Sequence, residues 1–226
     1  KWVYPGLSKS AIQRMMRDVR TVDEFQSEIS GPAFKMAIQT TTSGLSFTNF
    51  ESLSKEHAYL FLSNHRDIIL DSAILNVSLL EQGFKSTQIA IGDNLLRQQV
   101  IEDIVRSNKN FIVNRNVSAK EIFYYSQRLS NYISKTIDQD NTSIWIAQRE
   151  GRSKDGDDRT ATGLLKMFAM SGMNIEDTLL KLNIIPMAVS YEYDPCDLLK
   201  TNELMHIKQF GEYEKKSGED FLSMLK

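Results

Sequence analysis

The chain has 226 residues, of which 41% are hydrophobic and 25% charged, with 11 glycines and 4 prolines. These values are typical of globular domains and exclude collagen-like, low-complexity and wholly disordered chains. The net charge is −2, so the chain does not have the excess of basic residues that is typical of nucleic-acid-binding proteins. The single Cys excludes a disulfide framework. No apolar run of the sequence is long enough to span a membrane.

Helical signals dominate the first part of the chain. Apolar residues three and four positions apart over 11–19 predict a helix, and Gly31-Pro32 predicts a break. We therefore expect a two-helix appendage over residues 1–43, followed by one larger domain over 44–226.

From residue 44 onward, short apolar runs alternate with helical patterns. Such alternation predicts an α/β fold with a mixed, mostly parallel sheet flanked by helices. The predicted strands are 45–50, 58–62, 88–92, 111–113, 142–147 and 184–191. The predicted helices are 68–80, 94–107, 118–137, 162–170 and 175–182, with a further helix after residue 197.

Strong polar groups follow several of these strands, where sites form in open α/β sheets. A polar cluster that begins at Ser63 follows the strand 58–62 directly and places His65 at the strand end, and Asp67 and Asp71 come shortly after His65. Either carboxylate could accept a hydrogen bond from one imidazole nitrogen, which would leave the other nitrogen as a base.

Two further clusters predict anion binding. Arg115 follows the apolar run 111–113, where a guanidinium could bind an anion with two hydrogen bonds. After the strand 142–147 comes Glu150-Gly151-Arg152-Ser153, which offers backbone and side-chain donors to a phosphate. The spacing Gly151-x4-Gly156 is not a P-loop, because Asp157-Asp158 stands where Lys and Ser or Thr are needed.

Taken in order, these clusters resemble the motifs of the glycerolipid acyltransferase superfamily. Asn64-His65 with Asp71 resembles its His-x4-Asp motif, Phe111 to Arg115 its second motif, and Glu150 to Ser153 its third. The strand at Ile185-Pro186 resembles the fourth motif, and Tyr191-Glu192 is similar to the glycerol-3-phosphate branch. The resemblance covers about residues 44–195.

The sequence departs from the family pattern in two places. Five residues separate His65 from Asp71 instead of four, so either Asp71 or Asp67 could be the partner of His65, and we favour Asp71. The extra residue must be accommodated in the turn before the helix or as a bulge in it. In the third motif, Gln148-Arg149 replaces the usual aromatic residue and Pro.

The resemblance implies direct transfer of a fatty acyl group to a hydroxyl of glycerol-3-phosphate or 1-acylglycerol-3-phosphate in phospholipid biosynthesis. His65 would be the general base and Asp71 its orienting partner. The residues implied in substrate binding are Asn64, Arg66, Arg115, Glu150, Gly151, Arg152 and Ser153. No metal or other cofactor is implied, since the donor, acyl-CoA or acyl-carrier protein, is a co-substrate.

We expect no nucleic-acid partner and a cytoplasmic location, peripheral on the inner face of the membrane. The N-terminal appendage could lie on a bilayer or pack against the main domain. An alternative to the enzyme is a catalytically inactive lipid- or acyl-carrier-binding module of the same fold. The two can be distinguished by whether a carboxylate faces His65.

Overall fold

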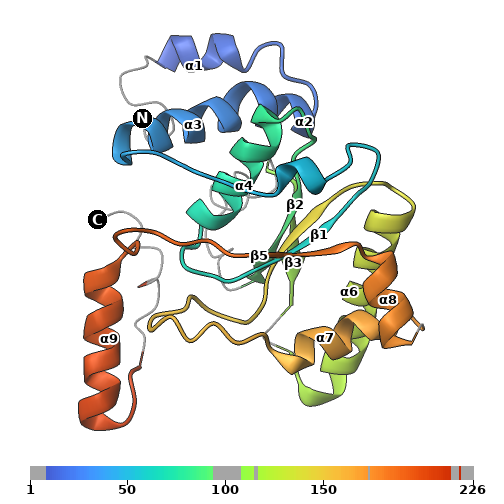
Figure 1. Ribbon diagram of the computed structural model, residues 1–226, viewed down its shortest axis with the longest axis vertical. Helices are drawn as coiled ribbons and strands as arrows, with labels where there is room; N and C mark the ends of the chain where they lie inside the picture. Colours follow the sequence, from blue (N-terminus) through green and yellow to red (C-terminus); the bar gives the residue numbers. More distant parts are fainter. Residues whose placement is uncertain (1–8, 94–107, 115–116, 173, 215–218, 220–226) are drawn as a thin grey trace.

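The structure is a computed structural model that describes residues 9–93, 108–114, 117–172, 174–214 and 219. At its centre lies a parallel sheet of β1 (Leu60–Ser63), β2 (Gln88–Gly92), β3 (Asn110–Val113), β4 (Ile144–Ala147) and β5 (Ile184–Met187), as Figure 1 shows. The strand order is β3-β2-β4-β1-β5, and all described pairings are parallel. The predicted α/β class is confirmed, and the sheet, which we had expected to be mixed and mostly parallel, is parallel in every described pairing. The predicted helix 94–107 lies outside the described residues.

Helices cover both faces of the sheet, because side chains alternate along each strand. On one face, Phe61 and Trp145 pack with Leu75 and Leu79 of α4 (Leu70–Glu81). On the other face, strand residues Leu60, Ile144 and Ile146 form the largest buried cluster. That cluster is completed by side chains of α6 (Ala119–Asp138) and α7 (Thr162–Phe168), and partly buried residues of α8 (Ile175–Lys181) pack against it. Figure 1 shows α4 on one side and α6, α7 and α8 on the other.

The N-terminal segment is helical, as predicted, with α1 (Lys9–Met15), α2 (Val22–Glu24), the π-helix Phe25–Ser30 and α3 (Gly31–Thr41). The predicted break at Gly31-Pro32 is wrong, because the chain stays helical from Val22 to Thr41. Pro32 lies in the first turn of α3, where its missing N–H costs little. The Gly31 N–H donates to the Gln26 carbonyl, and a Cβ at residue 31 would lie 2.6 Å from that oxygen. Glycine therefore permits the helix to continue.

The predicted strand 45–50 is also wrong. This segment has no strand pairing and ends in a short 3-10 helix, Phe50–Ser52, which follows Asn49 in the left-handed region. Its alternating apolar residues pack outside the sheet, where Phe50 meets Phe47 and Phe84 edge-on. The alternating pattern thus marked a largely exposed segment, of which only Phe50 packs against the cluster that includes Leu75 and Leu79 of α4, rather than a sixth strand.

The last strand is shorter than predicted, whereas the helix expected after residue 197 is present. β5 ends at Met187, four residues before the predicted end, because its neighbour β1 ends at the paired residue Ser63. β5 is an edge strand in this sheet, which explains how Pro186 is tolerated within it. The chain then runs to α9 (Asp197–Phe210), which projects from the body of the molecule in Figure 1. Among the described residues, no helix is both long enough and apolar enough to cross a bilayer.

Candidate active site

The segments that follow β1, β4 and β5 meet at the carboxyl edge of the sheet. The Gln148 N–H donates to the Ser63 carbonyl over 2.7 Å, and the Asn64 N–H donates to the Met187 carbonyl over 3.3 Å. The Ser153 N–H donates to the carbonyl of His65 over 2.6 Å. These bonds bring the first, third and fourth sequence clusters together at one place.

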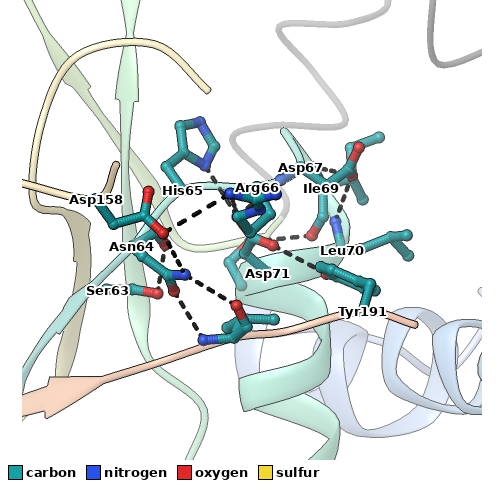
Figure 2. A network of polar contacts seen from close by, with 12 residues as sticks. Ser63, Asn64, His65, Arg66, Asp67, Ile69, Leu70, Asp71, Asp158 and Tyr191 are labelled. Atoms are coloured by element: carbon teal, nitrogen blue, oxygen red, sulfur yellow. Dashed lines mark hydrogen bonds and ion pairs between the residues drawn. The ribbon is translucent and has the colours of Figure 1, made fainter. Parts of the chain in front are cut away.

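His65 and Asp71 form a hydrogen-bonded pair at this edge. Nδ1 of His65 lies 3.0 Å from Oδ2 of Asp71, as Figure 2 shows. The same oxygen accepts hydrogen bonds from the backbone N–H groups of Arg66, over 2.7 Å, and Asp67, over 2.9 Å. Asp71 is fully buried, so its charge is balanced by these donors rather than by water.

Asp67 has a different function from Asp71. Its Oδ1 accepts hydrogen bonds from the N–H groups of Ile69 and Leu70, both over 2.9 Å, and Leu70 is the first residue of α4. Asp67 therefore caps the start of that helix. Because α4 begins at Leu70, the extra residue between His65 and Asp71 is accommodated in the turn, and Asp71 lies in the first turn of the helix.

The second oxygen of Asp71 is occupied by a tyrosine. The Tyr191 hydroxyl donates to Oδ1 over 2.9 Å from the segment after β5. Burial raises the pKa of Tyr191 far above its ordinary value, and the adjacent Asp71 charge and hydrogen bond raise it further. The hydroxyl thus stays protonated and acts as a donor.

The outer nitrogen of His65 faces away from this network. The imidazole packs edge-on against buried Trp145, with ring centroids 5.8 Å apart. Its side chain is 15% exposed, and Nε2 has no hydrogen-bond partner among the described residues. The nitrogen opposite Asp71 can therefore accept a hydrogen bond from a ligand.

Asn64, expected to bind substrate, uses its amide within the protein. Nδ2 donates to the Val189 carbonyl over 2.9 Å and to Oδ2 of Asp158 over 3.2 Å, and Oδ1 accepts from the Val189 N–H over 2.7 Å. These contacts join the segment after β5 to the segment after β1. Burial alone would raise the pKa of Asp158, but hydrogen bonds from Ser153 and Asn64 and the charge of Arg66 outweigh it and lower that pKa.

Arg66, also expected to bind substrate, is held by carboxylates. Its Nε donates to Oδ1 of Asp194 over 2.9 Å, and Nη1 lies 3.8 Å from Oδ2 of Asp158. Lys200 of α9 pairs with Asp194 and donates to the Arg66 carbonyl over 2.7 Å. The Lys200 side chain is 4% exposed, so α9 is anchored to the His65 turn by a buried ammonium group.

The third cluster forms a more open loop beside His65. Gly151 has a φ of +75°, and a Cβ placed there would meet no atom within 4 Å. Glu150 is exposed, Arg152 is half-buried, and Ser153 is fully buried where its N–H meets the His65 carbonyl. Arg115, the remaining predicted anion ligand, lies outside the described residues.

Sequence reasoning missed several residues of this network. Asp158 was considered only as evidence against a P-loop, and Asp194 and Lys200 were not considered. Tyr191 was noted only as part of a motif and was placed at the end of the predicted strand 184–191, whereas β5 ends at Met187 and Tyr191 lies beyond it. The rule that polar groups after strand ends form sites could have identified Tyr191, whereas nothing in the helical pattern of α9 distinguishes Lys200.

The described residues offer no ready metal site. None of their His, Cys, Asp and Glu side chains form a group of three or more that could hold an ion. Cys196, the single cysteine, is half-buried at the start of α9.

Comparison with known proteins identifies the family of this chain. A search of curated proteins found no match. Residues 44–190 match the family model described as Acyltransferase, and this stretch is well over half of the 226 residues. It includes His65, Asp71 and the loop from Glu150 to Ser153. The sheet that brings these residues together and the family match lead to the same conclusion: the chain belongs to the acyltransferase family, within the glycerolipid acyltransferase superfamily.

Proposed function

We propose that this acyltransferase moves a fatty acyl group from acyl-CoA or acyl-carrier protein to a hydroxyl of glycerol-3-phosphate or 1-acylglycerol-3-phosphate, with His65 as the general base. The observation that carries the proposal is the pair itself. His65 Nδ1 lies 3.0 Å from Oδ2 of the fully buried Asp71, while Nε2 has no hydrogen-bond partner among the described residues.

The carbonyl of a thioester is already activated toward attack. The enzyme therefore mainly needs a base that removes the proton of the acceptor hydroxyl. Nε2 of His65 takes the proton of the acceptor hydroxyl as its oxygen attacks the thioester carbonyl. The tetrahedral intermediate then expels the thiolate, which receives the proton back from the imidazolium. Asp71 stabilises that imidazolium from the other side of the ring. The overall exchange gives an ester and a free thiol.

The loop from Glu150 to Ser153 supports the choice of a phosphorylated acceptor. Its open glycine lets a ligand approach the backbone closely, and Arg152 adjoins the N–H that contacts the His65 carbonyl. A guanidinium group next to backbone that a ligand can approach closely is suited to binding a phosphate. In this proposal Arg152 binds the acceptor phosphate within reach of the base, and Arg115 adds to it.

The products would be membrane lipids, so we propose that the protein is cytoplasmic and works at the inner membrane surface in phospholipid biosynthesis. Binding of the N-terminal helices to the bilayer remains part of this proposal. Co-sedimentation of the protein with vesicles that contain anionic lipid, at low and high salt, tests it.

The arrangement of the carboxylates argues against a module that only binds lipid or acyl carrier. An inactive module would leave Asp67 and Asp71 both turned away from His65, whereas Asp71 accepts from the imidazole. The alternative therefore has no observation in its favour.

A donor-by-acceptor matrix tests the proposal. The full chain is incubated with palmitoyl-CoA or palmitoyl-acyl-carrier protein and with glycerol-3-phosphate or 1-acylglycerol-3-phosphate, and products are identified by mass spectrometry. His65→Ala should lower the turnover of the productive pair by about 10²- to 10⁴-fold. His57→Ala, which changes an exposed histidine, is the matched control. Turnover by His65→Ala at the wild-type rate would reject the base assignment.

A further inference from the structure

The two oxygens of Asp71 are held from different parts of the chain. Oδ2 accepts from His65 and from the backbone of the turn after β1, whereas Oδ1 accepts from the Tyr191 hydroxyl. Tyr191 comes 120 positions later in the sequence. A carboxylate that is fixed at both oxygens has a defined plane, and that plane sets the direction of the imidazole.

We propose that Tyr191 is a positioning residue for the His65–Asp71 pair, acting through Oδ1 of Asp71. This inference rests on the proposed function, in which His65 is the base. Tyr191 does not contact His65, so its effect on the proton transfer must pass through the carboxylate.

The backbone around Tyr191 makes it suited to this role. Two residues earlier, Val189 is bonded through both its N–H and its carbonyl to the side-chain amide of Asn64. Asn64 directly precedes His65, so the segment that carries Tyr191 is held in register with the base itself. Further along, Asp194 holds Arg66 by its Nε. The tyrosine is therefore anchored on both sides to the turn that it supports.

Loss of the hydroxyl has two expected consequences. The carboxylate gains freedom to rotate, so fewer molecules hold the imidazole in the productive orientation. The carboxylate also keeps more negative charge, which favours the imidazolium and moves the acid limb of the activity profile to higher pH. Removal of a hydrogen bond to a charged group can lower turnover by about tenfold. Substrate binding should change little, because Tyr191 is not part of the loop from Glu150 to Ser153.

Tyr191→Phe tests the proposal in the full chain, with the most productive donor and acceptor. We expect kcat to fall by about tenfold while KM for both substrates stays within about twofold of wild type. The acid limb should move up by about half a pH unit. Tyr193→Phe is the matched control, since its side chain is 81% exposed two residues away. A Tyr191→Phe enzyme with wild-type kcat and pH profile, or one changed only in KM, would overturn the proposal.

A double-mutant cycle separates this role from a general structural one. If Tyr191 acts through Asp71, Tyr191→Phe should have no further effect on kcat in an Asp71→Asn background. Additive losses would mean that Tyr191 acts by another route. If Tyr191→Phe fails to fold, 3-fluorotyrosine at position 191 keeps the shape and strengthens the donor, and it should move the acid limb to lower pH. An unmoved limb would then contradict the proposal.

A measurement without turnover distinguishes failure of this inference from failure of the proposed function. The His65 ring is followed by NMR in histidine-labelled protein and assigned by its loss in His65→Ala. Its titration midpoint should rise in Tyr191→Phe whether or not the substrates are correct, and an unchanged midpoint would overturn the inference. Absence of product from wild type in the donor-by-acceptor matrix would instead reject the function.

Discussion

The turn after β1 and the loop after β4 lie side by side at the same edge of the sheet, yet they are built in opposite ways. In the turn, every oxygen of Asp71 is occupied, and Asp67 caps the following helix. In the loop, Gly151 adopts a left-handed conformation with open space around it, and Glu150 is exposed. The backbone hydrogen bond from the Ser153 N–H to the His65 carbonyl is among the contacts that join the two regions.

This contrast matches the different demands of chemistry and binding. A base must be held in one orientation, which is achieved by fully satisfied buried polar groups. A loop that receives a charged ligand needs donors and space instead. We therefore expect loss of the supporting side chains of the turn to change kcat and stability, and loss of the basic side chain of the loop to change KM. Four substitutions, from the largest expected effect to the smallest, can break or sharpen this division.

Asp71→Asn should have the largest effect. The amide cannot accept all the hydrogen bonds that the carboxylate accepts, and it no longer stabilises an imidazolium. We expect kcat to fall by about 10²- to 10⁴-fold and unfolding free energy to fall by about 1–3 kcal/mol. Steady-state kinetics and denaturant titration measure the two changes. Asp67→Asn should spare most of the activity, because Asp67 caps a helix, and an equal loss in both variants would contradict the assignment of Asp71 as partner.

Lys200→Met should weaken the support of the turn from α9. It removes the donor to the Arg66 carbonyl and leaves Asp194 paired with Arg66 alone. We expect a loss of about 1–3 kcal/mol of stability and a Tm lower by several degrees, with kcat reduced less than in Asp71→Asn. Lys208→Met, which changes an exposed lysine of the same helix, should leave the Tm near that of wild type. Equal melting curves for the two variants would show that the buried ammonium does not anchor α9.

Arg152→Ala tests the loop as the site of acceptor binding. Loss of a guanidinium that binds phosphate should raise the apparent KM for the phosphorylated acceptor by about tenfold or more, with a much smaller change in kcat. The KM for the thioester serves as an internal reference. Arg159→Ala, at a side chain that is 83% exposed in the same loop, is the control. An unchanged acceptor KM would remove Arg152 from the phosphate site.

Gly151→Ala should have the smallest effect. No atom obstructs the added methyl group, so only the left-handed backbone penalises alanine, by about 1–2 kcal/mol. The Tm should fall by a few degrees. Gly163→Ala, which adds a methyl group to α7 in equally open space without a positive φ, should raise stability by up to about 1 kcal/mol. A similar Tm change of the same sign in both variants would contradict the role of backbone conformation.

Much of the fold could be predicted from the sequence, because its signals are local. Buried parallel strands give short apolar runs, and the capping box at Ser118 and Glu121 marks the start of α6. The positions of His65 and of the loop from Glu150 to Ser153 followed from the strand ends that precede them. Errors arose where the cause was not local. The alternation over 45–50 corresponds to no strand pairing, since only Phe50 of this segment packs against the cluster over α4. Gly31 continues a helix because the π-helix before it brings the Gln26 carbonyl close.

The residues that hold the His65–Asp71 pair in place could not be predicted from local sequence patterns, because their contacts are also not local. Asn64 and Arg66 carry the types of side chain that bind substrates, but their partners at 158, 189 and 194 are set by the sheet order. Lys200 is buried only because α9 returns to the turn after β1. Such contacts depend on which distant segments the topology brings together. The spacing of residues within the sequence does not indicate which segments these are.

The strand order has a consequence for how the protein is made. β1 has β4 and β5 as its two neighbours, and both are encoded far downstream. At a synthesis rate of about 5–20 residues per second, β1 leaves the ribosome several seconds before either partner strand exists. Its Leu-Phe-Leu run must stay soluble and unpaired for that time. We expect nascent chains that stop before β5 to be bound by chaperones, and the base to gain its full support only after Tyr191 and Lys200 have emerged.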